Sequence, residues 1–428
     1  MTRPLMLQVL LLVLVPAGNA TSAAGNEIGD DQGKDGSMTT TFELPRATPE
    51  EVGMSGERLN RVRDVVQEFI DENRIHYAVV GVARRGKVVY FEAQGVSKHE
   101  PVRKDAMFHM ASSTKPILGV AAMMVIEEGL FAPSDPVEKY IPEFKGIKVA
   151  VFDEKADKKT KADKKTKKGF KEAPEYRLID AHRPVTIHDL LTHTSGISGR
   201  APGRTQEIQH EGDTLATWIP IVAEGPLSFQ PGTRWGYGAG LDVVARVIEI
   251  VSGMPFNEFV QKRIFDPLDM KDTYWIVPKD KLHRMLVFVE GKAGTPTTYF
   301  SGSYGLVSTA RDYLHFEQML VNKGVLFGNR LLNPASVEMM STDQVGDLYD
   351  KAGKASAGVA FGYTVEVTVD PALAKGGRSA GSFGWGGAAG TVSWTDPKEE
   401  LAVAIMVQQP TKDLGVRIAE AIGAAIDD

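Results

Sequence analysis

The chain contains no cysteine, and this absence excludes several kinds of site at once. Without thiols there can be no disulfide, thiolate metal ligand, cysteine nucleophile or lipid-modified cysteine anchor. Basic residues are not in excess either, because the formal net charge is -6 at pH 7, so no broad nucleic-acid-binding surface is expected. The remaining composition, 43% hydrophobic and 24% charged residues among 428, is that of a globular protein with a large core.

Long hydrophobic segments are also lacking. An apolar run at 5–15 is too short to cross a bilayer, and it follows Arg3 and precedes a group of small residues. This pattern is typical of an export signal, so the sequence predicts a signal peptide at 1–20 and an exported protein, periplasmic or extracellular. A flexible leader is expected at 21–46, which is rich in Gly, Asp, Ser and Thr. No integral membrane segment is expected after processing.

The rest of the chain, 47–428, predicts one domain with strands at both ends and helices in the middle. Predicted strands lie near 77–83, 88–93, 361–369, 391–395 and 401–407, and predicted helices near 55–73, 116–129, 241–251, 256–264, 309–322 and 414–426. Strands from both ends imply one sheet assembled from the termini, with a helical lobe inserted between them. The expected fold class is therefore α/β, in the α+β sense.

A lysine-rich stretch interrupts this order. The hexapeptide Ala-Asp-Lys-Lys-Thr-Lys at 156–161 is repeated at 162–167, and lysine outnumbers acidic residues over 154–175. A charge run of this kind is more often a solvated surface excursion than a docking patch for an anionic partner. We therefore expect a surface insertion at 154–175, and the sequence names no protein partner for it.

Ser112 and Lys115 stand at the start of an almost wholly apolar helix predicted from Pro116 to about Gly129. Their spacing places both side chains on one helix face, where the amine can reach the hydroxyl. Burial of this helix would favour a neutral, basic lysine, and the helix N-terminus would stabilise negative charge at the serine. The pattern alone is weak, because a capping serine followed by a lysine with a buried stem gives the same letters.

Two later glycine-rich stretches add further candidate groups. The first, 231–240, can hold the Tyr237 hydroxyl over a cleft, where a phenol beside a lysine can exchange protons with a serine. The second, 383–391, brings glycines to the entry of a strand. Because glycine has no side chain, the backbone there can approach a substrate and donate an N–H hydrogen bond to an oxyanion.

Two other patterns suggest different chemistry and are weighed against these. His188 and His193 invite a metal interpretation, but their spacing turns them apart on a helix and no carboxylate pattern completes a site, so structural histidines are predicted. Ser379 matches the nucleophile-elbow pattern Gly-x-Ser-x-Gly at 377–381. That elbow needs a strand before the serine and a helix after it, whereas here a glycine-rich loop leads into a strand.

Taken together, the motifs resemble those of the serine β-lactamase superfamily, and most closely the family VIII carboxylesterases related to class C β-lactamases. They are Ser-x-x-Lys at 112–115, His-Thr-Ser-Gly at 193–196, Pro-Gly-Thr-x-x-x-Tyr at 231–237 and Trp-Gly-Gly at 385–387, in that order. The resemblance runs from about Glu51 to the C-terminus, outside the lysine-rich insertion. It implies a β-lactamase/penicillin-binding-protein-like fold, with an antiparallel sheet flanked by terminal helices beside an all-helical lobe.

The resemblance also implies a role for each candidate residue. Ser112 would be the acylated nucleophile, Lys115 its base, and Tyr237 the tyrosine that works with that lysine. The backbone N–H groups of Ser112 and Ala388 would form the oxyanion hole. The implied substrate-binding residues are Trp385, Gly386 and Gly387. No metal and no organic cofactor is implied.

This chain departs from the superfamily's β-lactamases and peptidases at two motifs. They carry Tyr-x-Asn where this chain has Tyr-Gly-Ala at 237–239, and Lys-Thr-Gly where it has Trp-Gly-Gly at 385–387. The missing lysine would leave a substrate carboxylate unpaired, which favours a neutral ester. Trp385 would supply apolar area for an acyl or alcohol group, although a packed core tryptophan fits the sequence too.

The sequence therefore predicts an exported serine hydrolase of the carboxylesterase type. It would cleave small-molecule carboxylic esters through an acyl-enzyme on Ser112, with Lys115 and Tyr237 as general base and acid. Two alternatives stay open. One is an amide hydrolase of the β-lactamase or DD-peptidase kind, and the other is a non-catalytic binding protein that keeps the fold and uses 154–175 as its contact.

Overall fold

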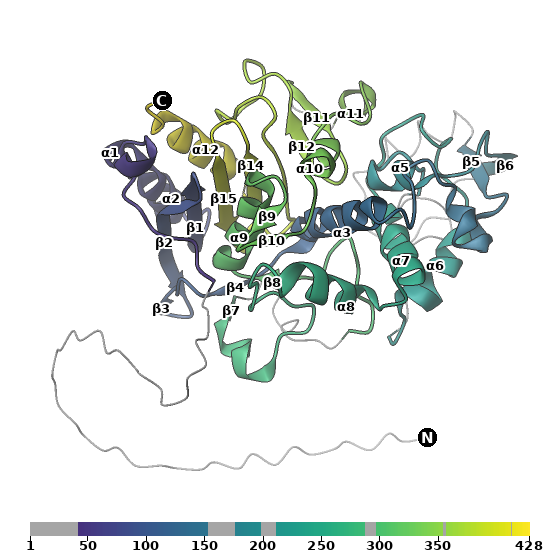
Figure 1. The fold of residues 1–428 in the computed structure, drawn as a ribbon, viewed down its shortest axis with the longest axis horizontal. Coiled ribbons are helices and arrows are strands. Elements are labelled where there is room, and N and C mark those ends of the chain that lie inside the picture. The colour runs from purple at the N-terminus through teal and green to yellow at the C-terminus, as the bar shows by residue number, and fades with distance from the viewer. Residues whose placement is uncertain (1–41, 153–175, 198–210, 287–296, 354–356, 412) are drawn as a thin grey trace, which may run out of the picture. The chain divides into compact units, whose positions relative to one another are not determined.

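The computed structural model describes residues 42–152, 176–197, 211–286, 297–353, 357–411 and 413–428 (Figure 1). The predicted signal peptide, the predicted leader up to Thr41 and the predicted insertion at 154–175 lie outside these residues. Phe42–Asp428 forms one unit. None of the described helices is long and apolar enough to cross a membrane.

Strands from both ends of the described chain form an antiparallel sheet of eight, in the order β11-β12-β13-β14-β15-β1-β2-β3. They are β1 (Tyr77–Arg84), β2 (Lys87–Ser97), β3 (Glu100–Pro101), β11 (Val359–Phe361), β12 (Glu366–Thr368), β13 (Phe383–Gly386), β14 (Val392–Asp396) and β15 (Leu401–Met406). The first strand pairs with the last, in a register running from Val79 opposite Met406 to Arg84 opposite Leu401. The sheet is thus assembled from the two chain ends, as predicted.

The single strand predicted for 361–369 is wrong, because the chain turns back within it. β11 ends at Phe361 and β12 begins at Glu366, with a turn closed by a hydrogen bond from Gly362 N–H to the Val365 carbonyl (2.9 Å). Gly362 is pressed against another segment, since a Cβ there would lie 2.3 Å from the Met340 carbonyl oxygen. The strand-favouring residues around it gave no sign of this long-range contact.

Terminal helices cover one face of the sheet. α2 (Arg61–Asp71) and α12 (Leu414–Ala424) pack on each other and on alternate β1 residues such as Val80 and Val82 (Figure 1). The helix predicted for 55–73 is divided at Asn60 into α1 (Gly56–Leu59) and α2, and Ser55 caps α1 by accepting from Arg58 N–H (3.3 Å).

The other face of the sheet meets the main core. α9 (Ala310–Val321) packs on β1, β14 and β15, and the intervening β1 residues Val79 and Ala83 join it in one apolar cluster with α3 (Lys115–Glu127). All α3 residues from Lys115 to Val125 are buried, as the apolar sequence predicted. In Figure 1, α3 runs from the sheet toward the group formed by α5, α6 and α7. The nucleophile motif therefore begins a helix that joins the two lobes.

Apart from α6 and α7, the remaining elements of the described chain are short. The helices are α5 (Ile187–Leu191), α6 (Leu215–Glu224), α7 (Gly240–Ser252), α8 (Phe256–Val260), α10 (Pro334–Met340) and α11 (Leu348–Lys351), and a π-helical turn, Gln261–Phe265, continues α8. The strands are β4 (Met107–His109), β5 (Lys148–Phe152), β6 (Tyr176–Asp180), β7 (Met285–Leu286), β8 (Val307–Ser308), β9 (Val325–Leu326) and β10 (Asn329–Arg330). β4 lies between β7 and β8 and leads directly to Ser112.

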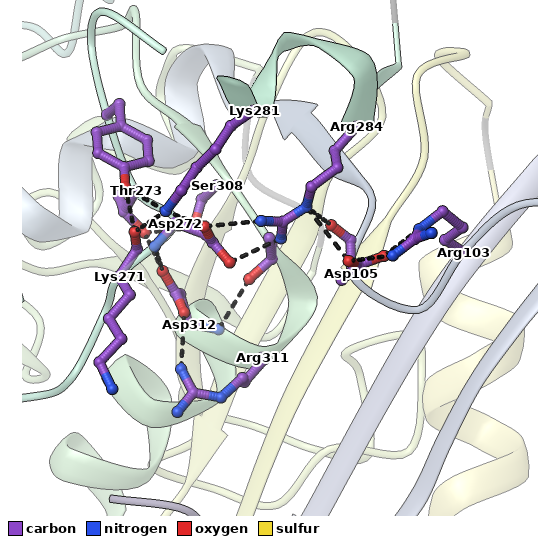
Figure 2. Close-up of polar contacts among 12 residues, drawn as sticks. Arg103, Asp105, Lys271, Asp272, Thr273, Lys281, Arg284, Ser308, Arg311 and Asp312 are labelled. Atoms are coloured by element: carbon purple, nitrogen blue, oxygen red, sulfur yellow. Dashed lines mark hydrogen bonds and ion pairs between the residues drawn. The ribbon is translucent and has the colours of Figure 1, made fainter. Parts of the chain in front are cut away.

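A charged cluster borders the small sheet β7-β4-β8 (Figure 2). Asp272 accepts two hydrogen bonds from the Arg284 guanidinium (2.9 and 2.7 Å) and one from Lys281 (2.8 Å). The buried Asp312 of α9 accepts from Asp272 N–H (2.7 Å), and Arg284 also donates to the Asp105 carbonyl just before β4 (2.9 Å). Because these bonds join β4 to η8 (Lys279–Arg284) and α9, they fix the strand that carries the nucleophile segment.

Glu317 of α9 is a buried carboxyl that should oppose folding at high pH. Burial raises its pKa to about 7, although the Thr395 hydroxyl donates to it (2.7 Å). In the folded protein this carboxyl therefore keeps its proton at pH values above its usual pKa of 4.5. The stability that the raised pKa contributes is complete below pH 4.5 and is lost as the pH rises toward 7. Glu317→Gln is expected to unfold like the unmodified protein at pH 4 and to be more stable by roughly 1–3 kcal/mol at pH 8.

Urea unfolding at the two pH values measures this difference. The exposed Glu338→Gln of α10 is the matched control and should change neither value. An equal effect of Glu317→Gln at both pH values would show that the carboxylate charge is not its cause.

Candidate active site

Ser112 and Lys115 lie where β4 passes into α3. Ser112 is in the single 3-10 turn η2 (Ala111–Thr114), and α3 begins at Lys115. The Lys115 amine donates to Ser112 Oγ (3.2 Å) and to the Ser303 carbonyl (2.7 Å), and only 2% of the lysine is exposed. Burial lowers the pKa of this amine, while Tyr237 and Asp242 oppose the shift. A lowered pKa favours the neutral form of the amine, and an amine of this kind beside a serine hydroxyl is the arrangement expected of a general base.

Tyr237 completes a three-residue group. It lies in the glycine-rich loop just before α7, and its hydroxyl donates to Ser112 Oγ at 2.7 Å. Its ring centroid is 4.6 Å from the Lys115 nitrogen, and 40% of the residue is exposed. The structure thus brings together Ser112, Lys115 and Tyr237, which are far apart in the sequence, and leaves the phenol open to a substrate.

An aromatic layer supports the Tyr237 ring. His193 lies with its ring centroid 4.7 Å from that of Tyr237, and Trp235 lies 5.9 Å away. Burial, and secondarily the charge of Lys115, lowers the pKa of His193 to about 3, so its imidazole is neutral at physiological pH. The backbone also joins the two segments, since Gly236 N–H donates to the His193 carbonyl (2.8 Å).

The sequence prediction treated His193 as structural and gave Trp235 no role. In the structure, His193 and Trp235 both lie against the ring of Tyr237. The signals that could have found them are their places within the His-Thr-Ser-Gly and Pro-Gly-Thr-x-x-x-Tyr motifs.

Trp385 also packs against Tyr237. Its ring is stacked on the tyrosine with a centroid separation of 6.0 Å and an interplanar angle of 23°, and its edge packs against Phe361 at 5.5 Å. The residue is half-buried at the end of β13. Trp385 is therefore a packed aromatic side chain next to the tyrosine, and its contact with an acyl or alcohol group stays a prediction.

The glycines after Trp385 bring the β13–β14 turn against the nucleophile segment. A Cβ at Gly387 would lie 2.2 Å from the Met110 carbonyl oxygen, whereas one at Gly386 would meet its nearest atom at 3.3 Å. Thr391, at the end of the turn, has its hydroxyl 2.9 Å from Ser113 Oγ and donates to the Met110 carbonyl (3.2 Å). The turn and the segment 110–113 are thus bonded together.

Ala388 lies inside this turn, which is closed by a bond from Gly390 N–H to the Gly387 carbonyl (2.9 Å). The N–H of Ala388 is not the donor of this bond. Ser112 lies in the first turn of η2, where N–H groups have no partner within the helix. The two N–H groups assigned to an oxyanion hole are therefore on adjoining segments, and the assignment itself stays a prediction.

The close approach at Gly387 leads to a test. Gly387→Ala is expected to push the turn away from Met110 and to lower kcat/KM for an ester by about 100-fold, because an error of about 1 Å in catalytic geometry has that effect. Gly386→Ala, one residue away, should cost less than tenfold, since its Cβ would need only a small adjustment of the Thr391 carbonyl oxygen at 3.3 Å. Steady-state kinetics of both variants measure the two losses in kcat/KM. Similar losses would show that the contact between Gly387 and Met110 is not critical.

Ser379 and His188, which belong to the two competing patterns, have other partners. Ser379 donates through its hydroxyl to Glu399 (3.0 Å) and through its N–H to Asp396 (2.9 Å), at the far end of the β14–β15 hairpin. His188 has its Nδ1 2.9 Å from the Tyr363 hydroxyl, and burial lowers its pKa. Within the described residues no three histidine or acidic side chains are grouped so that they could hold a metal.

Comparison with known proteins places the chain in a family. Residues 62–426 match the family model described as Beta-lactamase. Protein Rv1367c of Mycobacterium tuberculosis is 31% identical over 386 residues, covering 83% of this chain and 91% of that protein. Esterase EstB of Burkholderia gladioli is 29% identical over 388 residues, covering 81% and 89%.

A solved structure shares the fold. EstCE1, a hydrolase with promiscuous acyltransferase activity, superposes with a TM-score of 0.68 at 24% identity, over 86% of this chain and 99% of that one. The family, fold class and serine-hydrolase type predicted from the sequence are thereby confirmed. With this family match over most of its length, the chain belongs to the beta-lactamase family.

Proposed function

We propose that this protein is an exported carboxylesterase that hydrolyses small carboxylic esters through an acyl-enzyme on Ser112. The observation that carries the proposal is the position of Ser112 Oγ, within hydrogen-bond distance of both the Lys115 amine (3.2 Å) and the Tyr237 hydroxyl (2.7 Å). The similarity to esterase EstB supports an ester as the substrate.

The proposed reaction has two halves. Ser112 Oγ attacks the ester carbonyl carbon while its proton passes to the Lys115–Tyr237 pair, and the tetrahedral oxyanion is held by the N–H groups of Ser112 and Ala388. The carbon–oxygen bond to the alcohol then breaks, and the alcohol leaves with a proton from Tyr237. Water attacks the acyl carbon, gives a proton to the same pair, and the acid leaves as Ser112 recovers its hydrogen.

The surroundings of Ser112 favour a neutral ester over a β-lactam. Superfamily members that bind an anionic substrate place a lysine where this chain has Trp385, and the Trp385 ring lies stacked on Tyr237. A substrate carboxylate beside that ring would lose water without gaining a cation. The Tyr-x-Asn amide is also replaced, by Ala239. These changes disfavour the amide hydrolase, and the close contacts of Ser112 disfavour a non-catalytic binding protein.

Site mapping with a fluorophosphonate tests the proposal. Peptide mass spectrometry of the labelled protein is expected to find the phosphonyl group on Ser112, with labelling lost in Lys115→Ala. Ser379→Ala is the matched control and should label normally. Modification of Ser379 instead would overturn the site, and no modification would favour the binding protein. Covalent trapping by penicillin at low concentration would favour the amide hydrolase.

Export rests on the sequence at 1–20 and is tested separately. The N-terminal sequence of the protein purified from its native cells is expected to begin after that segment. A mature chain that still starts at Met1 would contradict this part of the proposal.

A further inference from the structure

A buried carboxylate holds the segment that faces Lys115. Asp242, in the first turn of α7, is 3% exposed and accepts from Ser301 Oγ (2.7 Å) and Ser303 N–H (3.0 Å) through Oδ1. Its Oδ2 accepts from the Tyr299 hydroxyl (2.9 Å). Ser301 Oγ in turn accepts from Tyr304 N–H (3.2 Å). Ser301 Oγ also accepts from Ser303 N–H (2.9 Å). Asp242 therefore fixes the segment 299–304 by three direct hydrogen bonds and, through Ser301, by two more.

The same segment supplies the second partner of the Lys115 amine. The Ser303 carbonyl accepts from Lys115 Nζ at 2.7 Å, which is shorter than the 3.2 Å contact of that nitrogen with Ser112 Oγ. Ser303 is thus held by Asp242 through its N–H and holds Lys115 through its carbonyl. α7 also follows directly on the loop of Tyr237, so one helix start connects both partners of Ser112.

We propose that Asp242 is a positioning residue of the ester-hydrolysis site, which fixes the Ser303 carbonyl against Lys115 and so directs the amine toward Ser112. The inference rests on the proposed function. A neutral lysine amine has two N–H groups and one lone pair. When Ser303 accepts one N–H, rotation about the Cε–Nζ bond is restricted, and the lone pair can face the Ser112 proton.

The charge of Asp242 acts in the same direction as its hydrogen bonds. Burial lowers the pKa of Lys115, and the two groups that oppose this are Tyr237 and Asp242. His193 also faces the amine, and burial keeps it neutral by lowering its pKa to about 3. Behind Asp242, burial raises the pKa of Tyr304 to about 12 and that of Tyr299 further, so neither adds charge at neutral pH. Loss of the Asp242 charge should therefore lower the pKa of Lys115.

Two substitutions separate charge from geometry. Asp242→Asn keeps an oxygen for Ser301 and Ser303 but removes the charge. Ser301→Ala keeps the charge and removes the bond from Ser301 Oγ to Asp242, together with the bonds that Oγ accepts from the N–H groups of Ser303 and Tyr304. In Asp242→Asn the acid limb of the kcat/KM profile for a p-nitrophenyl ester should move down by about 0.5–1 pH unit. In Ser301→Ala the limb should stay in place while kcat falls by roughly tenfold.

Asp189→Asn is the matched control. Asp189 is also a buried carboxylate in the first turn of a helix, but it pairs with Arg183 (2.6 and 2.8 Å) and Thr186 rather than with the segment at Lys115. This variant should lose stability and leave the acid limb where it is. The same shift in Asp189→Asn and Asp242→Asn would overturn the proposal, because any loss of a buried carboxylate would then produce it.

A second measurement does not depend on activity. The Lys115 amine can be titrated by NMR in protein labelled at lysine Cε, with the signal assigned from Lys115→Met. The titration should lie at lower pH in Asp242→Asn than in the unmodified protein, and identical titrations would overturn the inference even if no ester is cleaved. Titration as expected in a protein without esterase activity would instead reject the proposed function and retain the link between Asp242 and Lys115.

Discussion

Lys115→Met is expected to lower kcat/KM for a p-nitrophenyl ester by roughly 10³-fold or more, nearly as far as Ser112→Ala. The amine lies 3.2 Å from Ser112 Oγ on a side chain that is 2% exposed, and in the variant the methionine side chain occupies its place without supplying a base. Because the two residues act on the same proton, their effects should not add. The double variant is expected to be no slower than the slower single one.

Methionine is chosen because it keeps most of the volume of a side chain that is 2% exposed. Lys139→Met is the matched control, since Lys139 is an exposed lysine paired with Asp135 (3.0 Å), and it should retain full activity. Unchanged circular dichroism would show that Lys115→Met is folded. Activity within tenfold of the unmodified protein in Lys115→Met would mean that Lys115 is not the base.

The parts of the site that follow from local pattern could be predicted from the sequence. The apolar run after Lys115 gives a helix buried on every side, and the three-residue spacing to Ser112 sets the contact between them. Tyr237 could be added only through the order of the motifs, because its distance in sequence from Ser112 carries no geometric information. That the two chain ends share one sheet could also be predicted, because strand patterns occur near both ends of the sequence.

The parts that depend on contacts between distant segments could not be predicted. Asp242 and Ser303 are 61 residues apart, and nothing in either local sequence shows that a carboxylate of one helix fixes a carbonyl of another loop. The turn at Gly362 has the same origin, since the neighbour that requires glycine is the Met340 carbonyl. Hydrophobic period and turn residues report which element forms, whereas such pairings are decided by how the elements pack.

Tyr237→Phe is expected to lower kcat/KM by about 10²–10⁴-fold, with a dependence on the leaving alcohol. The phenol lies 2.7 Å from Ser112 Oγ and is 40% exposed, so it can reach the oxygen of a departing alcohol as well as the serine. An alkoxide is a poor leaving group and needs that proton, whereas p-nitrophenolate leaves without it. The loss should therefore be larger for an ethyl or benzyl ester than for a p-nitrophenyl ester of the same acid.

The ratio of the two losses is the measurement, because it cancels any general disturbance of the site. Removing the phenol oxygen leaves the ring contacts of Tyr237 with His193 and Trp385 in place, so the aromatic layer should persist. Tyr304→Phe removes the phenol of another tyrosine, the partly buried neighbour of Ser303, and should leave the ratio of alkyl to aryl ester rates unchanged. Equal losses for both esters in Tyr237→Phe would restrict Tyr237 to the activation of Ser112. Protonation of the alcohol would then have to come from Lys115, the other group in contact with Ser112 Oγ.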